Sequence, residues 1–223
     1  MILTDENLHY LLNVVRAKAG TSIETYDGIG GLYQWEITEL SRKTAHLNRT
    51  SSRQTERKSP VILRLGLNPL KGGSEEYAIR MAAAMEVAEL KPVFFKRSDV
   101  PFDENMLEKR LDRWFRICLN EVALSGSAYI PEISKPIQFE DLVGSTRPRT
   151  IVFYEQADPI QGDVTFTNGE EILALIGPEG GIDDGEAERA RKNGCEITSL
   201  GDWTLRAQLA AAQVPSWVYS KVK

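Results

Sequence analysis

The chain has 223 residues, with 27 Lys and Arg against 32 Asp and Glu, so its formal net charge is −5, and 42% of its residues are hydrophobic. This composition is typical of a globular protein of one or two domains, and no apolar stretch approaches the ~18 residues that cross a bilayer. The N-terminus lacks the blocks of a signal peptide, so we expect a cytoplasmic protein with no membrane partner. Two cysteines and two histidines are too few for a disulfide framework or a zinc site, and we expect no metal.

The first part of the chain combines a helical pattern with a β-meander. Residues 8–15 have helical spacing of apolar residues, and residues 22–40 alternate like strands around a glycine-rich turn at Gly28–Gly31. The polar segment 50–60 has no periodicity and predicts a linker, so we place the end of a small first domain at residue 59. Lys and Arg are frequent between residues 42 and 58, where they either neutralise phosphates or belong to a solvated β-hairpin edge or linker.

From residue 60 to residue 223, strand patterns alternate with helical patterns. Apolar, strand-like runs occupy residues 61–69, 91–98, 150–156, 171–181 and 195–201. Helical patterns occupy residues 75–88, 104–126, 184–193 and 205–221. This alternation predicts an α/β fold with a mainly parallel sheet and helices on both of its faces.

The most informative segment lies where the fourth of these strands ends. Residues Gly177–Gly181 contain three glycines and a proline, which permit tight backbone conformations and expose N–H and C=O groups to a flat ligand. Asp183 or Asp184 then begins a helix whose first turn is acidic. Negative charge at this helix start disfavours a phosphate ligand, whereas a neutral adenosine or a cationic sulfonium is compatible.

Two signatures carry a resemblance to a known family. The segments Leu175–Gly181 (LIGPEGG) and Ser199–Ala211 (SLGDWTLRAQLAA) resemble those of the RsmE family of SPOUT methyltransferases. The resemblance implies S-adenosylmethionine-dependent methylation of N3 of a uridine in 16S ribosomal RNA of the small subunit. It also implies a PUA-like RNA-binding β-barrel domain over residues 1–59, a SPOUT-type trefoil-knotted α/β methyltransferase domain over residues 60–223, and a homodimer.

The resemblance further implies that three turns surround S-adenosylmethionine, with the adenine between apolar side chains. The expected cofactor-binding residues are Tyr154, Glu155, Leu175, Ile176, Gly177, Pro178, Glu179, Gly180, Leu200, Gly201, Thr204, Leu205 and Ala210. The expected catalytic residues are Arg206 and Gln208, and the expected RNA-binding residues are Arg16, Lys71, Arg97 and Ser125. In this scheme Arg206 stabilises a uridine anion, and the alternative for Arg206 is an ordinary salt bridge.

Several positions expected on the substrate side depart from the family pattern. Residues 81–86 read MAAAME where the family has KATELG, Ser127 stands in place of an arginine, and Gln208 stands in place of a glutamate. Two alternatives therefore remain open: a SPOUT methyltransferase for another RNA site, and a paralogue that binds S-adenosylmethionine and RNA with weakened catalysis. No motif residue identifies the proton acceptor.

Overall fold

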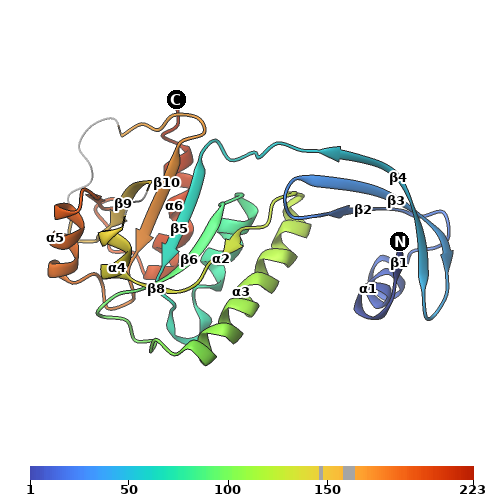
Figure 1. Cartoon of the computed structure of the whole chain (residues 1–223), viewed down its shortest axis with the longest axis horizontal. Helices are drawn as coiled ribbons and strands as arrows, with labels where there is room; N and C mark the ends of the chain where they lie inside the picture. The colour runs from blue at the N-terminus through green and yellow to red at the C-terminus, as the bar shows by residue number, and fades with distance from the viewer. Residues whose placement is uncertain (146–147, 158–163) are drawn as a thin grey trace. The chain divides into compact units, whose positions relative to one another are not determined.

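The computed structural model describes residues 1–145, 148–157 and 164–223, and the chain divides into two compact units, Met1–Arg57 and Lys58–Lys223 (Figure 1). The expected domain boundary, at residue 59, falls just after this division. Each unit has its own hydrophobic core.

The N-terminal unit is a four-stranded antiparallel sheet with a helical segment. The strand order is β1 (Ile2–Leu3), β4 (Ala45–Gln54), β3 (Gly31–Leu40) and β2 (Ser22–Tyr26). The helix α1 (Asp5–Tyr10) continues into a π-helical turn, η1 (Leu11–Val15), so the predicted helix is confirmed but begins earlier. Leu8 and Leu11 from these turns pack against Ile37, Ala45 and Leu47 of the sheet, and this packing holds the unit together.

The glycine-rich turn between β2 and β3 is confirmed as a hairpin turn. The Asp27 carboxylate accepts hydrogen bonds from the backbone N–H groups of Ile29 at 2.9 Å and Gly31 at 2.8 Å. Gly28 and Gly30 have φ angles of 83° and 103°, which a side chain would disfavour. Strand β3, and not a helix, follows this turn, so its glycines do not form the phosphate-binding loop of a dinucleotide site.

The expected linker begins later than the sequence suggested. Residues 50–54 belong to β4 and pair with β3, with Gln54 opposite Gly31 and Ser52 opposite Tyr33. Their polar side chains are exposed, so the strand shows no apolar alternation, and the prediction of a linker over these residues was wrong. Arg49 and Arg53 lie exposed on this strand, a position that is compatible both with a solvated hairpin edge and with phosphate binding.

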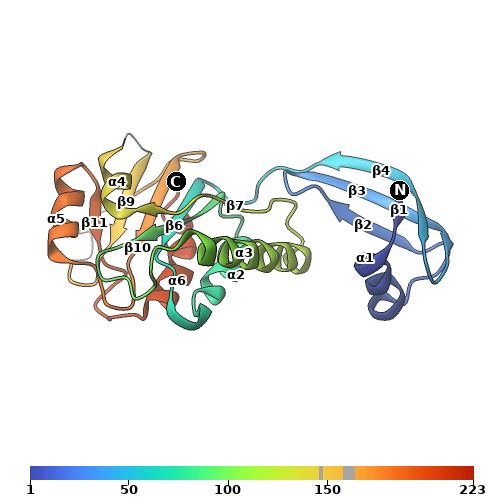
Figure 2. The ribbon, with the colours of Figure 1, turned by 60° about the horizontal axis from the view of Figure 1, so that its bottom comes forward.

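The described residues of the C-terminal unit form a seven-stranded sheet, and the pairings between these strands are parallel. Its order is β11 (Glu196–Thr198), β9 (Arg149–Phe153), β10 (Glu171–Ile176), β5 (Ile62–Leu67), β6 (Glu89–Phe94) and β7 (Glu132–Ile133), with β8 (Ile137–Gln138) also paired to β6. The helical elements are η2 (Lys71–Gly73), α2 (Glu76–Ala84), α3 (Glu104–Ser125), α4 (Phe139–Gly144), α5 (Asp184–Lys192) and α6 (Ala207–Tyr219) (Figure 2). The predicted α/β fold is confirmed.

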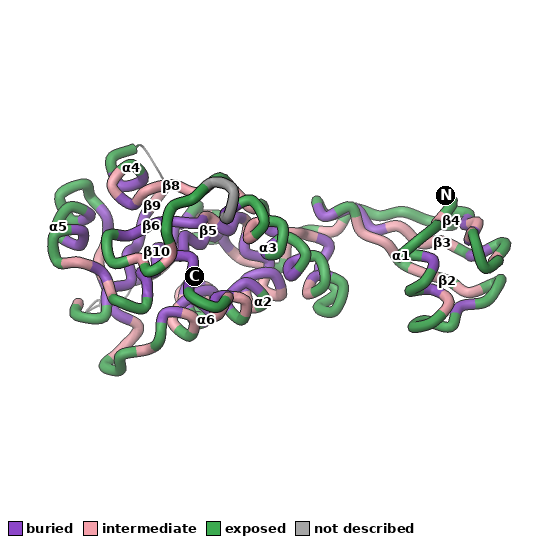
Figure 3. Tube along the Cα trace, turned by 90° about the horizontal axis from the view of Figure 1, so that it is seen from below, coloured by how far each residue is buried: buried purple, intermediate pink, exposed green. Residues whose placement is uncertain are grey.

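Successive residues of the central strands point to opposite faces of the sheet and join two separate cores. Ile172, Ala174 and Ile176 of β10 pack in the cluster formed with α2, α3 and α6. Leu173 and Leu175 pack in the cluster formed with α4 and α5. Strands β9 and β10 are therefore largely buried on both faces (Figure 3), and this burial explains their continuous apolar sequences. Among the described residues, no helix has the length and low polarity needed to span a membrane.

The parallel arrangement brings distant loops together at one edge of the sheet. Phe153, the last residue of β9, is in register with Ile176 of β10 and with Thr198 of β11. The chain leaves all three strands at this carboxyl edge, which is where open α/β sheets bind their ligands.

Candidate active site

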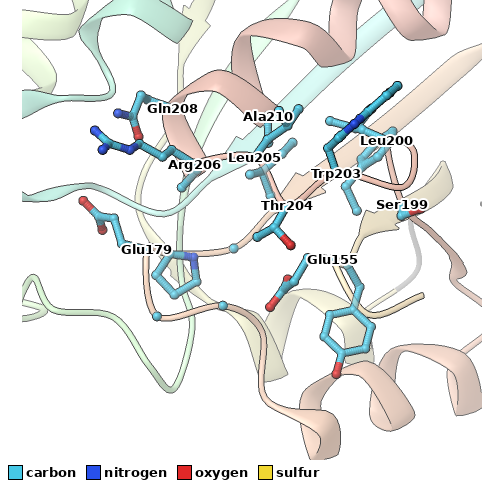
Figure 4. Close-up of a pocket in the computed structure, with 18 of the residues that line it drawn as sticks. Glu155, Glu179, Ser199, Leu200, Trp203, Thr204, Leu205, Arg206, Gln208 and Ala210 are labelled. Carbon is cyan, nitrogen blue, oxygen red and sulfur yellow. The ribbon is translucent and has the colours of Figure 1, made fainter. Parts of the chain in front are cut away.

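A pocket of about 670 Å³ lies at this edge, within the size range of small-molecule sites. The three turns that follow β9, β10 and β11 line it together with the start of α6, and Figure 4 shows how their side chains surround it. The lining residues are Ser74, Phe153, Tyr154, Glu155, Ile176, Gly177, Pro178, Glu179, Gly180, Gly181, Ser199, Leu200, Trp203, Thr204, Leu205, Arg206, Ala207, Gln208 and Ala210.

The turn after β10 depends on its glycines for steric reasons. A Cβ on Gly177 would lie 2.5 Å from Cγ1 of Ile182, and one on Gly181 would lie 2.3 Å from Oε1 of Glu155. Gly181 also has a φ angle of 73°, in the left-handed region. The turn thus passes too close to Ile182 and Glu155 for side chains at these two positions, and all of its residues, Gly177–Gly181, line the pocket.

The start of α5 fixes the far end of this turn. Asp183 is the N-cap: its carboxylate accepts a hydrogen bond from the backbone N–H of Gly185, and Glu186 completes the capping box. Lys96 and Arg97 each form an ion pair with Asp183 at 3.2 Å. These cations, together with the Gly185 N–H bond, keep the pKa of Asp183 below its usual value; Lys96 is the largest cause.

The turn after β9 is tied to α5 as well. The Tyr154 hydroxyl donates a hydrogen bond to the Asp184 carboxylate, and the Tyr154 backbone N–H donates to the Thr198 carbonyl at 2.8 Å. Burial, followed by the hydrogen bond to Asp184, raises the pKa of Tyr154 to about 12. These two hydrogen bonds fix the start of the turn, and the next residue, Glu155, lines the pocket.

The turn after β11 leads into α6. Gly201 has a φ angle of 136°, and Cε3 and Cζ3 of Trp203 lie 3.5 Å from the position that a Cβ on Gly201 would occupy. Trp203 is 79% exposed while it lines the pocket, which is unusual for so large an apolar side chain. Arg206 precedes α6, and its carbonyl accepts the N–H groups of Leu209 and Ala210, each at 2.9 Å.

Arg206 and Gln208, the expected catalytic residues, both line the pocket. Arg206 is exposed, and it has no ion-pair partner among the residues that the structure describes, so the salt-bridge alternative finds no support in this chain. Its guanidinium is available to a negatively charged substrate group.

Most of the expected cofactor-binding residues also line the pocket: Tyr154, Glu155, Ile176, Gly177, Pro178, Glu179, Gly180, Leu200, Thr204, Leu205 and Ala210. Leu175 and Gly201 are not among the lining residues. Leu175 points to the opposite face of the sheet, where it is fully buried in the core with α5, because neighbouring strand residues alternate in direction. The backbone of Gly201 shapes the turn without lining the pocket.

The expected RNA-binding residues lie in different places. Lys71 and Arg97 are close to the pocket: the Lys71 N–H donates to Oε1 of Glu179 at 3.3 Å, and the Arg97 carbonyl lies 3.2 Å from the Cβ position of Gly180. Ser125 ends α3, where its hydroxyl donates to the Val122 carbonyl. Arg16 is exposed in the N-terminal unit, at the end of η1.

Several lining residues were not predicted from the sequence. Gly181, Ser199 and Ala207 lie inside the two signatures, and Phe153 directly precedes the predicted turn at Tyr154 and Glu155, so extending each predicted turn by one or two residues would have included them. Ser74 comes from the loop after β5, and no motif marks it. Trp203 lies inside the second signature, and its exposure becomes evident only in the fold.

The chemistry of the pocket fits S-adenosylmethionine. Phe153, Ile176, Leu200 and Leu205 provide apolar surface for an adenine, and the glycine turn provides backbone donors and acceptors. Glu155 and Glu179 add negative charge, which suits a sulfonium cation and opposes a phosphate. No group of side chains suited to a metal ion is found in the described parts of the chain.

Comparisons with known proteins agree with this architecture. Residues 57–218 match the RNA methyltransferase domain family, and residues 3–48 match the RNA methyltransferase PUA domain family. The chain is 32% identical to ribosomal RNA small subunit methyltransferase E of Mesomycoplasma hyopneumoniae (strain 232), over 94% of this chain and 89% of that protein. It is 23% identical to the protein of the same name from Bacillus subtilis (strain 168), over 93% of this chain and 85% of that protein.

A solved structure shows the same fold. The crystal structure of a ribosomal RNA small subunit methyltransferase E from Neisseria gonorrhoeae, bound to S-adenosyl methionine, superposes with a TM-score of 0.84 at 22% identity. The similarity covers 97% of this chain and 90% of that one. The matched families, the relatives and the arrangement of the pocket lead to one conclusion: the chain belongs to the RsmE family of ribosomal RNA small subunit methyltransferases.

Proposed function

We propose that this protein transfers a methyl group from S-adenosylmethionine to N3 of a uridine in 16S ribosomal RNA. The observation that carries the proposal is the pocket formed by the three turns at the carboxyl edge of the sheet, with Arg206 and Gln208 on its rim. Relatives that match nearly the whole chain are named for methylation of small-subunit ribosomal RNA, which supports the same substrate class.

Bound S-adenosylmethionine supplies an electrophilic methyl group. The protein's own task is to hold the uridine in line with that methyl group, because orientation of the reactants lowers the barrier. The Arg206 guanidinium stabilises the negative charge that N3 and its neighbouring carbonyls acquire when the N3 proton leaves.

The test is methyl transfer to purified small ribosomal subunits that lack the modification, followed by nucleoside mass spectrometry. We expect 3-methyluridine from the wild type and at least a hundredfold slower transfer by Arg206→Ala, about the effect of losing one charge-stabilising donor. A different methylated nucleoside would identify an enzyme for another RNA site. Binding of S-adenosylmethionine without transfer, with activity gained by Gln208→Glu, would identify the weakened paralogue.

We further propose that residues 1–59 bind RNA and that the protein acts as a homodimer in the cytoplasm. The exposed Arg16 and the basic strand β4 support RNA binding, because cationic side chains neutralise phosphates. Light scattering at micromolar concentration tests the homodimer, and a mass of one chain would contradict it. Weaker RNA binding by Arg49→Ala and Arg53→Ala, with a shallower dependence on salt, would support the role of β4.

A further inference from the structure

Methylation of uridine N3 requires the loss of a proton that is bound at neutral pH. The nitrogen lone pair must attack the methyl carbon, so a nearby group must accept the N3 proton during or before the transfer. This requirement rests on the proposed function, and neither family signature assigns the acceptor.

The side chains that line the pocket leave few candidates. Neither of the chain's two histidines, His9 and His46, lines it, and Arg206 carries no acceptor. Tyr154 holds its own proton in a hydrogen bond to Asp184. Hydroxyl and amide side chains are weak bases, so two carboxylates remain among the described lining residues, those of Glu155 and Glu179.

The two carboxylates occupy different sides of the pocket. In Figure 4, Glu179 lies on the same side as Arg206 and Gln208, whereas Glu155 lies beside Thr204 on the other side. Oε1 of Glu155 would lie 2.3 Å from a Cβ on Gly181, so this carboxylate packs against the glycine turn. A group next to the expected anion-stabilising Arg206 is better placed to meet the uridine.

One carboxylate oxygen of Glu179 is held by a hydrogen bond, and the other is available to accept a proton. Oε1 accepts a hydrogen bond from the Lys71 backbone N–H at 3.3 Å, while the Lys71 ammonium pairs with Asp99 at 3.1 Å instead of with Glu179. Among the described residues, Glu179 forms no ion pair that would neutralise it, and its side chain is exposed to the pocket mouth. An exposed, unpaired glutamate on this rim is suited to accept a proton and to release it to solvent.

We propose that Glu179 is the proton acceptor of the methyl transfer. Its carboxylate takes the N3 proton of the uridine, and Arg206 stabilises the resulting negative charge. The N3 lone pair forms the bond to the methyl carbon, the carbon–sulfur bond breaks, and its electron pair stays on sulfur. The sulfonium becomes a neutral thioether, and Glu179 then gives its proton to water, so that atoms and charges balance.

The experiment compares the two pocket carboxylates. Glu179→Gln and Glu155→Gln are measured in the wild-type background for kcat on small subunits, for the pH profile of kcat, and for S-adenosylmethionine affinity by calorimetry. We expect Glu179→Gln to lower kcat at pH 7 by about 10²–10⁴-fold, the usual contribution of general base catalysis, and to weaken cofactor affinity less than Glu155→Gln does. We expect Glu155→Gln to weaken cofactor binding and to retain most of kcat at saturation.

The pH profile distinguishes a proton acceptor from a structural residue. Without the base, transfer depends on uridine that has already lost its proton, so kcat of Glu179→Gln should rise about tenfold per pH unit in the alkaline range. Glu179→Asp should recover part of the activity, and Glu188→Gln, on the outer face of α5, should match the wild type in every measurement.

Each outcome decides the matter. If the wild type forms 3-methyluridine and Glu179→Gln does so at the same rate, Glu179 is not the acceptor while the proposed function stands. If Glu179→Gln loses cofactor binding and its pH profile does not change, Glu179 binds the cofactor and is not the proton acceptor. If the wild type forms no 3-methyluridine, the proposed function fails and the assignment of Glu179 fails with it.

Discussion

Replacing Gly181 by alanine should weaken cofactor binding strongly and destabilise the fold only slightly. At a φ angle of 73°, an alanine pays about 1–2 kcal/mol for the left-handed conformation. Alanine also lowers the conformational entropy of the unfolded chain, which stabilises the folded state by about 0.4–1 kcal/mol. The net loss of stability is about 1 kcal/mol, or a fall of about 2–4 °C in Tm for a domain of this size.

The same substitution has a second effect inside the pocket. The new Cβ would lie 2.3 Å from Oε1 of Glu155, so the carboxylate must move away. Loss of a hydrogen bond that the Glu155 carboxylate accepts from the cofactor costs about 1.5–3 kcal/mol, which is roughly a tenfold to hundredfold weaker affinity. Isothermal calorimetry with S-adenosylmethionine measures this affinity, and thermal unfolding measures the stability.

Gly194→Ala is the matched control for this experiment. Gly194 has a φ angle of 78°, has no atom within 4 Å of its Cβ position, and follows α5 away from the pocket. It should lose the same stability as Gly181→Ala and keep full cofactor affinity. Equal affinities for the two variants would refute the placement of Glu155 at the cofactor, and a weaker affinity for Gly194→Ala would show that strain alone explains the effect.

Three further predictions concern other residues. Glu86→Gly relieves the strain of a φ angle of 56° but removes the buried carboxylate that accepts hydrogen bonds from the Lys58 N–H and the Ser127 hydroxyl. Urea unfolding should therefore show a free energy of unfolding lower by about 1–3 kcal/mol, and a more stable variant would contradict this. The raised pKa of Tyr154 contributes stability below pH 10 that is lost as the pH rises through about 12, so Tyr154→Phe should flatten the fall of stability across this range. Trp203→Phe should remove most of the change in tryptophan fluorescence that S-adenosylmethionine causes, and an undiminished change would place Trp203 away from the ligand.

The α/β unit could be predicted from the sequence because burial on both faces leaves a continuous apolar pattern. β10, with the sequence EILALI, is such a strand. The turn that follows it was predicted from its three glycines and its proline. The end of β4 could not be predicted, since residues 50–54 are exposed and polar and pair only through their backbone. The threading of the knot stays a prediction from the family resemblance, because strand order alone does not define it.

The sequence predicted which turns form the pocket, but not which residues of each turn line it. Strand alternation decides which of two neighbours lines the pocket, so Ile176 does and Leu175 does not, and a motif gives no such information. Ser74 is separated from the signatures by about a hundred residues of sequence and joins them through the parallel pairing of β5 with β10.

The residues that depart from the family pattern do not all lie on one surface, so Ser127 and Gln208 have different consequences for the pocket. Ser127 is 1% exposed, and its hydroxyl donates to the Glu86 carboxylate at 3.0 Å, so it belongs to a buried network and does not line the pocket. The prediction that Ser127 lies on the substrate side was wrong. An arginine at this position would have its charge buried inside the protein. Gln208, in contrast, lines the pocket beside Arg206. The amide at Gln208 removes a carboxylate near the guanidinium, which leaves the charge of Arg206 free for the uridine anion and makes Glu179 the remaining carboxylate on that side.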